Sequence, residues 1–158
     1  MYQDIPALEI GSSNKIKGIS YDAFLIKYKE YIEEEKKINE ILNTTTKRFI
    51  LKSKNKLIGE VGIRTTLNDF WINKGSQIYY KIRLSERNKG YGNTILFLAL
   101  KEAKKLGFKK IRINCNDKNI FSKKIIIKNG GIVDIRSYKT NEWFSSSYII
   151  DLKDIKNK

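Results

Sequence analysis

The sequence predicts an α/β (α+β) fold built around a mixed, mostly antiparallel sheet with flanking helices. Two pairs of strand-like segments, each with turn residues between its members, predict antiparallel pairing near residue 50 and at the C-terminal end. Between these pairs, a strand, an amphipathic helix and a second strand follow one another, and such a βαβ unit implies locally parallel pairing. The chain has 158 residues, 41% of them hydrophobic, which suits a single domain over residues 1–158.

The first segment with a clear pattern runs from Ser20 to Asn43 and is predicted to be helical. Its apolar residues recur at helical spacing, and Ser20 is a suitable N-cap. Glu33 and Lys37 lie four residues apart, where opposite charges on a helix support one another. One long helix and two short helices both fit this pattern.

A hairpin is predicted next. Its strands are Arg48 to Lys52 and Leu57 to Thr66, and residues 53–56, Ser-Lys-Asn-Lys, favour a turn between them. Residues 67–75 are expected to form a connecting loop.

The βαβ unit follows this loop. The alternating segment QIYYKIRL predicts a strand from Gln77 to Leu84, and KKIRINC predicts another from Lys109 to Cys115. The helix between them is expected to begin at Tyr91 or Gly92 and to end at Gly107 in a left-handed cap.

The segment IIIKNGGIVDI, Ile125 to Ile135, has two interpretations. Taken alone, Asn-Gly between β-branched runs favours a hairpin, and a helix over residues 119–129 is the rival interpretation. Beyond it, IVDIRSYK and SSSYIIDLK flank the turn-prone residues 139–142, which predicts a second antiparallel pair.

The composition excludes several kinds of chemistry. The chain has no histidine, so Ser-His-Asp and Cys-His nucleophile systems and HExxH metal sites are excluded. Its one cysteine, Cys115, cannot form an internal disulfide or a cysteine zinc cage, and it agrees with a reducing compartment. The first residues, MYQDIPALEIGSSNK, do not show the basic region followed by an apolar stretch that is typical of a secretion signal, and no apolar run approaches about 18 residues. We therefore expect a cytoplasmic protein with no membrane partner and no metal.

The formal net charge is +15. Such an excess of Lys and Arg can mark a nucleic-acid binder, because these residues gain affinity by releasing phosphate counterions. Lysines are spread along the whole chain, however, and arginine, which is better suited to hydrogen bonding with nucleic-acid bases, is scarce. We therefore interpret the positive charge as solvated lysine on the protein surface, and nucleic acid is not the expected partner. A small anionic ligand is favoured by the same charge.

A glycine-containing turn stands between the predicted strand and helix of the βαβ unit. The first four N–H groups of a helix lack internal partners, and the helix dipole adds about half a positive charge there. Gly90 and Gly92 permit a sharp turn and let a phosphate approach these amides, and Arg87 and Lys89 add outer charge. Neither a Walker loop nor a dinucleotide-binding G-x-G-x-x-G is present. A phosphate site and a glycine-softened turn without a ligand both fit this segment.

The pattern Arg-x-x-Gly-x-Gly at Arg87 to Gly92 resembles the signature Arg/Gln-x-x-Gly-x-Gly/Ala of the GNAT superfamily of acyl-CoA-dependent N-acetyltransferases. The likeness extends over about half the chain, to a branch of predicted bacterial acetyltransferases. Three blocks with the same spacing carry it: IGEVGIRTTLN from Ile58, KGSQIYYKIRLSERNKGYG from Lys74 and NCNDKNIFSKKIIIKNGG from Asn114. The resemblance implies a GNAT-like fold whose two central parallel strands splay apart.

By this resemblance, acetyl-CoA is the cosubstrate, with its pantetheine arm between the splayed strands and its diphosphate at the glycine turn. Backbone groups of the third strand, amides of the turn and the start of the next helix would bind it. The implied residues are Tyr80, Lys81, Ile82, Arg87, Asn88, Lys89, Gly90, Tyr91, Gly92, Asn93, Asn119 and Ser122. Asn119 and Ser122 would open a helix that ends at Gly130, which settles the ambiguous segment in favour of helix.

The chain departs from the family pattern at four positions. Thr65 and Gln77 stand where the branch has histidines, and Leu84 stands where it has proline. Ile126 occupies the position of the tyrosine general acid that is frequent in the superfamily. The resemblance therefore supports the fold and the cosubstrate but supplies no route for the proton.

The candidates for catalysis are few. Glu60 is the first choice of general base, because a carboxylate within a strand can be partly desolvated and face the cleft; a surface glutamate, or an ion pair with Arg64, is the alternative. Tyr148 is a candidate proton donor to the leaving thiolate, with packing as the alternative. Cys115, without histidine, is interpreted as a partly buried thiol and not as a nucleophile. An amide near Ile82 is a candidate oxyanion donor.

These observations predict an acetyl-CoA-dependent N-acetyltransferase that transfers the acetyl group directly, in a ternary complex, to a primary amine. The amine acceptor is a small molecule or a protein. A noncatalytic module of this fold that binds CoA, nucleic acid or another anion is the alternative, and an enzyme for a longer acyl group or an oxygen nucleophile is a third. The oligomeric state, a homodimer included, stays open.

Overall fold

The structure, a computed structural model, describes residues 26, 29–30, 32–34, 36–37, 40, 43–53, 56–69, 75–134 and 145–155. From residue 45 onward, the described strands and helices follow one another in the predicted order, and the strand predicted from Gln77 to Leu84 is shorter, at Ile78–Ile82. The strands are β1 (Thr45–Ser53), β2 (Lys56–Thr66), β3 (Ile78–Ile82), β4 (Lys110–Asn116), β5 (Ile132–Val133) and β6 (Ser145–Asp151). The helices are α3 (Tyr91–Lys105) and α4 (Ile120–Lys128), with short 3-10 helices at Leu84–Glu86 and Leu152–Asp154.

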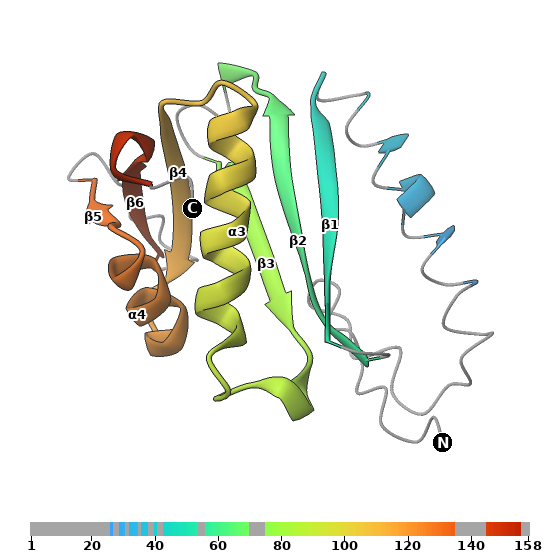
Figure 1. Ribbon diagram of the computed structural model, residues 1–158. Helices are drawn as coiled ribbons and strands as arrows, with labels where there is room; N and C mark the ends of the chain where they lie inside the picture. Colours follow the sequence, from blue (N-terminus) through green and yellow to red (C-terminus); the bar gives the residue numbers. More distant parts are fainter. Residues whose placement is uncertain are drawn as a thin grey trace.

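The strands form two antiparallel sheets, in the orders β1-β2-β3 and β4-β6-β5 (Figure 1). The predicted hairpin is confirmed as β1 and β2, and the predicted C-terminal pair is confirmed as β5 and β6. The turn predicted at residues 139–142 lies outside the described residues. Most of the helix predicted from Ser20 to Asn43 also lies outside them, and its described residues between 26 and 40 are helical.

The two sheets adjoin along β3 and β4, which run in the same direction (Figure 1). The main-chain N–H of Gln77 donates to the carbonyl of Arg112 (2.9 Å), and Oε1 of Gln77 accepts from the Arg112 N–H (2.6 Å). The Asn114 N–H donates to Oγ of Ser76 (3.2 Å). Further along, β3 and β4 belong to separate sheets and diverge. This arrangement confirms the predicted splayed parallel pair, and Gln77 forms its closed end.

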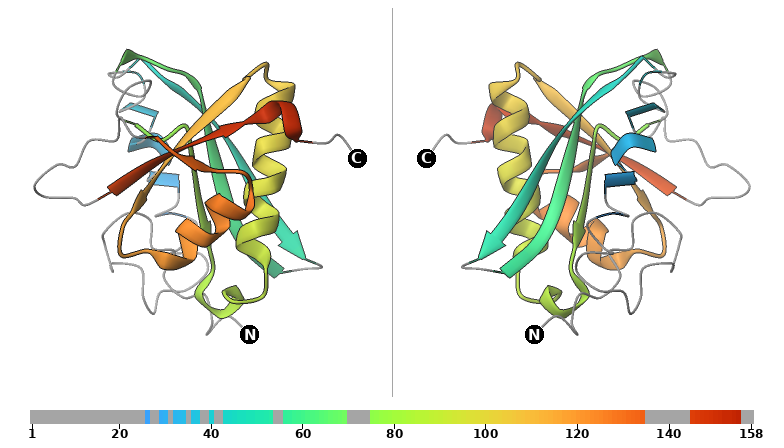
Figure 2. Two further views of the ribbon diagram at one scale, coloured as in Figure 1. Left: turned by 90° about the vertical axis from the view of Figure 1, so that its left-hand side faces the viewer. Right: turned by 90° about the vertical axis from the view of Figure 1, so that its right-hand side faces the viewer.

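Helix α3 covers one face of both sheets (Figures 1 and 2). Its side chains Ile95, Leu96 and Leu100 are at most 2% exposed and share one core with strand residues such as Ile63 and Ile111. Full burial of an aliphatic side chain contributes about 1.5–3 kcal/mol, so this helix holds the two sheets together. Among the described residues, no helix is both long and apolar enough to cross a bilayer.

Helix α4 settles the ambiguous segment. Asn129 is its C-cap and Gly130 has φ of 86°, the left-handed conformation that ends helices. The hairpin interpretation of Ile125 to Ile135 is therefore wrong, because Asn-Gly closes a helix here instead of forming a two-residue turn. Ile126 is fully buried in the core, which anchors α4 beside α3.

Candidate functional site

The gap between β3 and β4 exposes main-chain groups of β3. The hydrogen bond from Arg83 N to Ile58 O (2.9 Å) fixes which residues of β3 bond to β2. By the alternation of antiparallel pairing, Lys81 bonds to β2, whereas the main-chain groups of Tyr80 and Ile82 point towards β4. Because β4 has diverged there, these groups line the gap. Three strand residues are predicted to contact pantetheine. The main-chain groups of Tyr80 and Ile82 point into the gap, whereas those of Lys81 form hydrogen bonds with β2.

The turn between β3 and α3, residues 87–92, is called the glycine loop below. Gly90 is the N-cap of α3 with φ of 84°, and Asn88 also has positive φ, at 60°. Within the described part of the chain, the amides of residues 88–92 donate to no carbonyl and to no side chain. The amide of Asn93, by contrast, donates to the carbonyl of Gly90 (3.0 Å). The amides available to an anion therefore end at Gly92.

The two glycines of this loop serve different purposes. A Cβ on Gly90 would meet nothing within 4 Å, so glycine is required there for its left-handed backbone. A Cβ on Gly92 would lie 2.6 Å from Cδ1 of Ile125, so this glycine lets the start of α3 approach α4. Nδ2 of Asn129 also donates to Oδ1 of Asn93 (3.0 Å). Gly92 thus has a packing role between the helices that the sequence interpretation missed.

The two cations of the glycine loop are held by neighbouring groups. Nε of Arg87 donates to the carbonyl of Ile82 (3.2 Å), which ties the loop to the end of β3. Nζ of Lys89 lies 3.2 Å from Oε2 of Glu86, whose side chain is 4% exposed. Glu86, which the sequence analysis did not single out, is therefore a buried carboxylate directly behind the loop. No local pattern marks it, because its role depends on the turn that the loop makes.

The start of α4 forms the other side of the gap. Oδ1 of Asn119 accepts from the Ser122 N–H (3.0 Å), so Asn119 is the N-cap of the helix. This confirms that Asn119 and Ser122 open α4. Oγ of Ser122 lies 2.9 Å from the hydroxyl oxygen of Tyr80, and this hydrogen bond links β3 to α4 across the gap.

Removing the cap of α4 should weaken the fold measurably. We expect Asn119→Ala to lower the free energy of unfolding by about 1 kcal/mol, because the Ser122 N–H loses its acceptor. Asn119→Asp keeps an acceptor and serves as the matched control, with little change expected. Denaturant unfolding measures both variants, and equal stability of the alanine variant and the wild type would contradict the capping role.

Tyr80 should make the fold sensitive to alkali. Burial raises the pKa of its hydroxyl from 10.0 to about 12, and the Ser122 hydrogen bond acts in the opposite direction. The neutral phenol is favoured in the folded state, so its contribution is complete below pH 10 and is lost as the pH rises towards 12. We expect wild type to lose about 1–3 kcal/mol more unfolding free energy than Tyr80→Phe between pH 9 and 12. Denaturant titrations at both pH values measure this loss. An equal loss of unfolding free energy in wild type and Tyr80→Phe would contradict the prediction.

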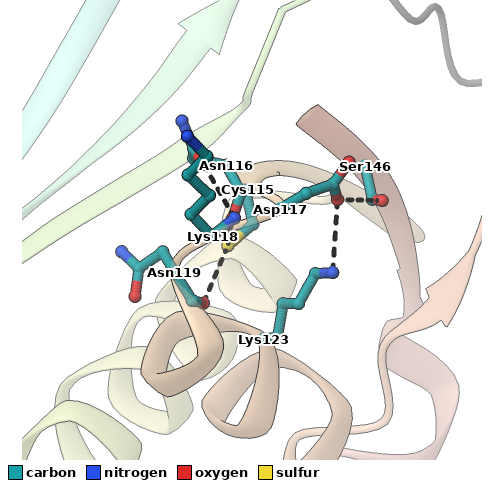
Figure 3. Close-up of polar contacts among 7 residues, drawn as sticks. All are labelled: Cys115, Asn116, Asp117, Lys118, Asn119, Lys123 and Ser146. Atoms are coloured by element: carbon teal, nitrogen blue, oxygen red, sulfur yellow. Dashed lines mark hydrogen bonds and ion pairs between the residues drawn. The ribbon is translucent and has the colours of Figure 1, made fainter. Parts of the chain in front are cut away.

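A polar network holds α4 to the second sheet (Figure 3). Oγ of Ser146 on β6 donates to Oδ1 of Asp117 (2.6 Å), and Nζ of Lys123 lies 3.2 Å from the same oxygen. The thiol of Cys115 donates to the carbonyls of Asn116 (3.4 Å) and Asn119 (3.6 Å). These contacts join residues distant in sequence, and they position the start of α4 against β4 and β6.

The two predicted catalytic residues lie in different surroundings. Glu60 is 5% exposed, and Nζ of Lys81 on the adjacent strand lies 3.9 Å from its Oε1. Arg64, the ion-pair partner considered in the sequence analysis, donates to the carbonyl of Ser76. Tyr148 is 3% exposed and belongs to the core that α3 covers. Glu60 is therefore beside the gap-lining strand, whereas Tyr148 has the surroundings of a packing residue.

No family model matches this chain. No curated protein sequence matches it either.

Solved structures of acetyltransferases share its fold. The spermidine N-acetyltransferase from Vibrio cholerae in complex with CoA and spermine is 17% identical, with a TM-score of 0.56 over 88% of this chain and 79% of that one. An acetyltransferase from Bacillus subtilis in complex with CoA is 18% identical, with a TM-score of 0.55 over 75% of this chain and 84% of that one. The yncA protein from Salmonella typhimurium, solved with acetyl-CoA, is 13% identical, with a TM-score of 0.55 over 96% and 84%. The chain thus has the fold of GNAT acetyltransferases, as its resemblance implies.

Proposed function

We propose that this protein is an acetyl-CoA-dependent N-acetyltransferase that transfers the acetyl group directly to a primary amine. One observation carries the proposal: the glycine loop, the gap-facing main chain of Tyr80 and Ile82 and the start of α4 all lie where β3 and β4 separate. Structures of the same fold contain CoA or acetyl-CoA, and the Vibrio cholerae enzyme also contains spermine, an amine. These complexes support the cosubstrate and the class of acceptor.

The glycine loop has the groups that a diphosphate requires. The amides of residues 88–92 are available, and the positive end of α3 adds to their attraction. Each charge-assisted hydrogen bond contributes about 1.5–3 kcal/mol, so several of them can supply micromolar affinity without a metal. Pantetheine would then lie against the main chain of Tyr80 and Ile82, with Ser122 on the far side.

The protein needs a group that takes a proton from the acceptor. Bound acetyl-CoA supplies an activated thioester, so a covalent enzyme intermediate is unnecessary. An amine of pKa near 10.4 is mostly protonated at pH 7, and making it neutral costs about 4–5 kcal/mol. We assign this proton to the Glu60 carboxylate, which is desolvated and lies next to gap-lining β3. Tyr148 is retained as the proposed proton donor to the leaving thiolate. Tyr148→Phe removes the hydroxyl, and a lower kcat is the result that this role predicts.

Direct transfer is favoured over a cysteine intermediate. Burial raises the pKa of the Cys115 thiol from its ordinary value, so little thiolate is present near neutral pH. The main-chain N–H of Ile82 faces the gap and is the proposed oxyanion donor, because a fixed amide there can stabilise charge that develops on the carbonyl oxygen.

Two measurements test the proposed function. Acetyl-CoA and CoA should raise the melting temperature, whereas oligonucleotides should not, and acetyl-CoA with a panel of amines should release free thiol. The opposite ranking in the melting experiment would favour a nucleic-acid-binding module. CoA binding without thiol release from any amine would indicate a noncatalytic CoA-binding module.

A further inference from the structure

The sheet β1-β2-β3 has one face packed under α3 and a second face that carries charged and aromatic side chains. Val61, Ile63 and Ile78 belong to the core, so the alternation of strands places their neighbours on the opposite face. We call this the outer face, and it includes Arg48, Glu60, Gly62, Arg64, Tyr79 and Lys81.

Two guanidinium groups of the outer face meet on one aromatic ring. The strand register places Arg48 and Tyr79 on either side of Gly62, and the ring lies over this glycine, where a Cβ would collide with it. Cζ of Arg48 lies 5.8 Å from the centroid of the Tyr79 ring, and Cζ of Arg64 lies 5.1 Å from it. Cation–π contacts of this kind hold the flat guanidinium groups in defined positions.

The next row of the outer face carries the proposed base. Glu60 lies opposite Lys81, and their charged atoms are 3.9 Å apart. These six residues include three cations and one carboxylate, a sum of +2. These charges favour an anion over a polycation, because the one carboxylate, which is 5% exposed, already has an ammonium group beside it.

The acceptor has to reach this outer face. The glycine loop leads directly into α3, and α3 covers the other face of the sheets (Figure 1). A pantetheine arm that passes from this loop through the gap therefore presents its thioester towards the outer face, next to β3. An amine on the outer face can approach both the thioester and Glu60.

We propose that the acceptor is a small amine that also carries an anionic group, a phosphate or a carboxylate. Arg64 binds the anionic group, since its fork of N–H donors matches these oxygens, and Arg48, whose Nη1 and Nη2 are buried, contacts the same Tyr79 ring. Glu60 accepts the proton that the ammonium form of the acceptor loses. The nitrogen of the neutral amine then bonds to the acetyl carbon, the electron pair of the broken C–S bond leaves with the CoA sulfur, and the second proton of the nitrogen passes to that sulfur. This inference rests on the proposed function and names its class of substrate.

Matched pairs of acceptors test the inference. Thiol release from acetyl-CoA is measured with phosphoethanolamine against ethanolamine, β-alanine against propylamine, and with spermidine. We expect the anionic member of at least one pair to have a kcat/KM at least about 10-fold higher than its neutral counterpart, and spermidine to be the poorest acceptor. The two pairs distinguish phosphate from carboxylate as the preferred group.

Variants of the guanidinium groups show whether this preference comes from the outer face. Arg64→Gln should bring the ratio between the paired acceptors close to one, mainly by raising KM for the anionic amine. Arg64→Lys keeps the positive charge but loses the forked pair of N–H donors, so we expect a ratio between those of the wild type and the glutamine variant. This second variant keeps the inference testable if Arg64→Gln fails to fold. Lys47→Gln is the matched control, because it removes one charge from an exposed position of β1 whose side chain alternates away from the outer face.

Two outcomes would overturn the inference and leave the proposed function standing. The first is wild-type enzyme that uses both neutral amines as well as their anionic counterparts, and the second is spermidine as the best acceptor. An unchanged ratio in both Arg64 variants would remove Arg64 from the site. Absence of thiol release with every amine would count against the proposed function itself and would remove this inference with it.

Discussion

Glu60→Gln is expected to lower kcat/KM for amine acetylation by about 10²- to 10⁴-fold at neutral pH, with the affinity for CoA unchanged. The glutamine side chain has nearly the same shape but cannot accept the proton of the acceptor. Glu60 lies on β2, whereas the groups proposed to bind CoA belong to β3, the glycine loop and α4. The loss should therefore appear in turnover and not in CoA binding, and steady-state thiol release together with calorimetry measures both.

The pH dependence distinguishes a base from a structural residue. If Glu60 removes the proton, the rate of the glutamine variant should rise with pH towards the pKa of the amine, because solvent then supplies the neutral acceptor. Glu102→Gln is the matched control, since it removes a carboxylate from the far part of α3 and should leave turnover unchanged. Wild-type rates in the Glu60 variant would show that another group or water takes the proton.

Tyr91→Glu is expected to weaken CoA binding by about 10- to 100-fold without destabilising the fold. Tyr91 is the first residue of α3, and a negative charge in the first turn of a helix is favourable for the helix itself. The same charge would lie beside the proposed diphosphate, where repulsion between like charges opposes binding. One substitution thus acts in opposite directions on the stability of α3 and on the affinity for CoA.

Tyr91→Gln is the control for lost contacts of the ring, because it shortens the side chain equally without adding charge. Its affinity should stay within a few-fold of wild type, while the glutamate variant binds CoA far more weakly at low salt and recovers partly at high salt. Equal affinities of the two variants would mean that the diphosphate lies elsewhere.

Local sequence signals were sufficient for most of the fold. Two strand-like segments separated by the turn-prone residues 53–56 predict β1 and β2, and the structure has a hairpin there. The start of α3 at Tyr91 and the left-handed φ of 89° at Gly107 also agree with the prediction. These elements are predictable because their caps, turns and periodicity involve residues close together in sequence.

The segment around Asn129 shows where local signals fail. Asn-Gly between β-branched runs favours a hairpin, yet the segment is helical, because Ile126 is buried in the core and Asn119 caps the helix. The resemblance to a family, and not the residues of the segment alone, favoured the correct alternative. Tertiary burial outweighed the turn propensity.

Several site residues could not be found from the sequence, because their roles depend on contacts between distant elements. Gln77 closes the splayed pair through Arg112 on β4, and the buried Glu86 lies 3.2 Å from Lys89 of the glycine loop. The main chain of Lys81 bonds to β2 because of the register between the two strands. This register cannot be predicted from the sequence of one strand alone. Residue type and spacing therefore identified the glycine loop, but not the groups that shape it.

The central claim is that the amides of residues 88–92 bind the diphosphate of CoA. Calorimetric titration of the wild-type protein with CoA and, separately, with pantetheine, which lacks the diphosphate, measures this directly. We predict a micromolar Kd for CoA and an affinity for pantetheine at least about 100-fold weaker, since several charge-assisted hydrogen bonds are lost. Equal affinities for the two ligands, or no binding of CoA, would contradict the claim.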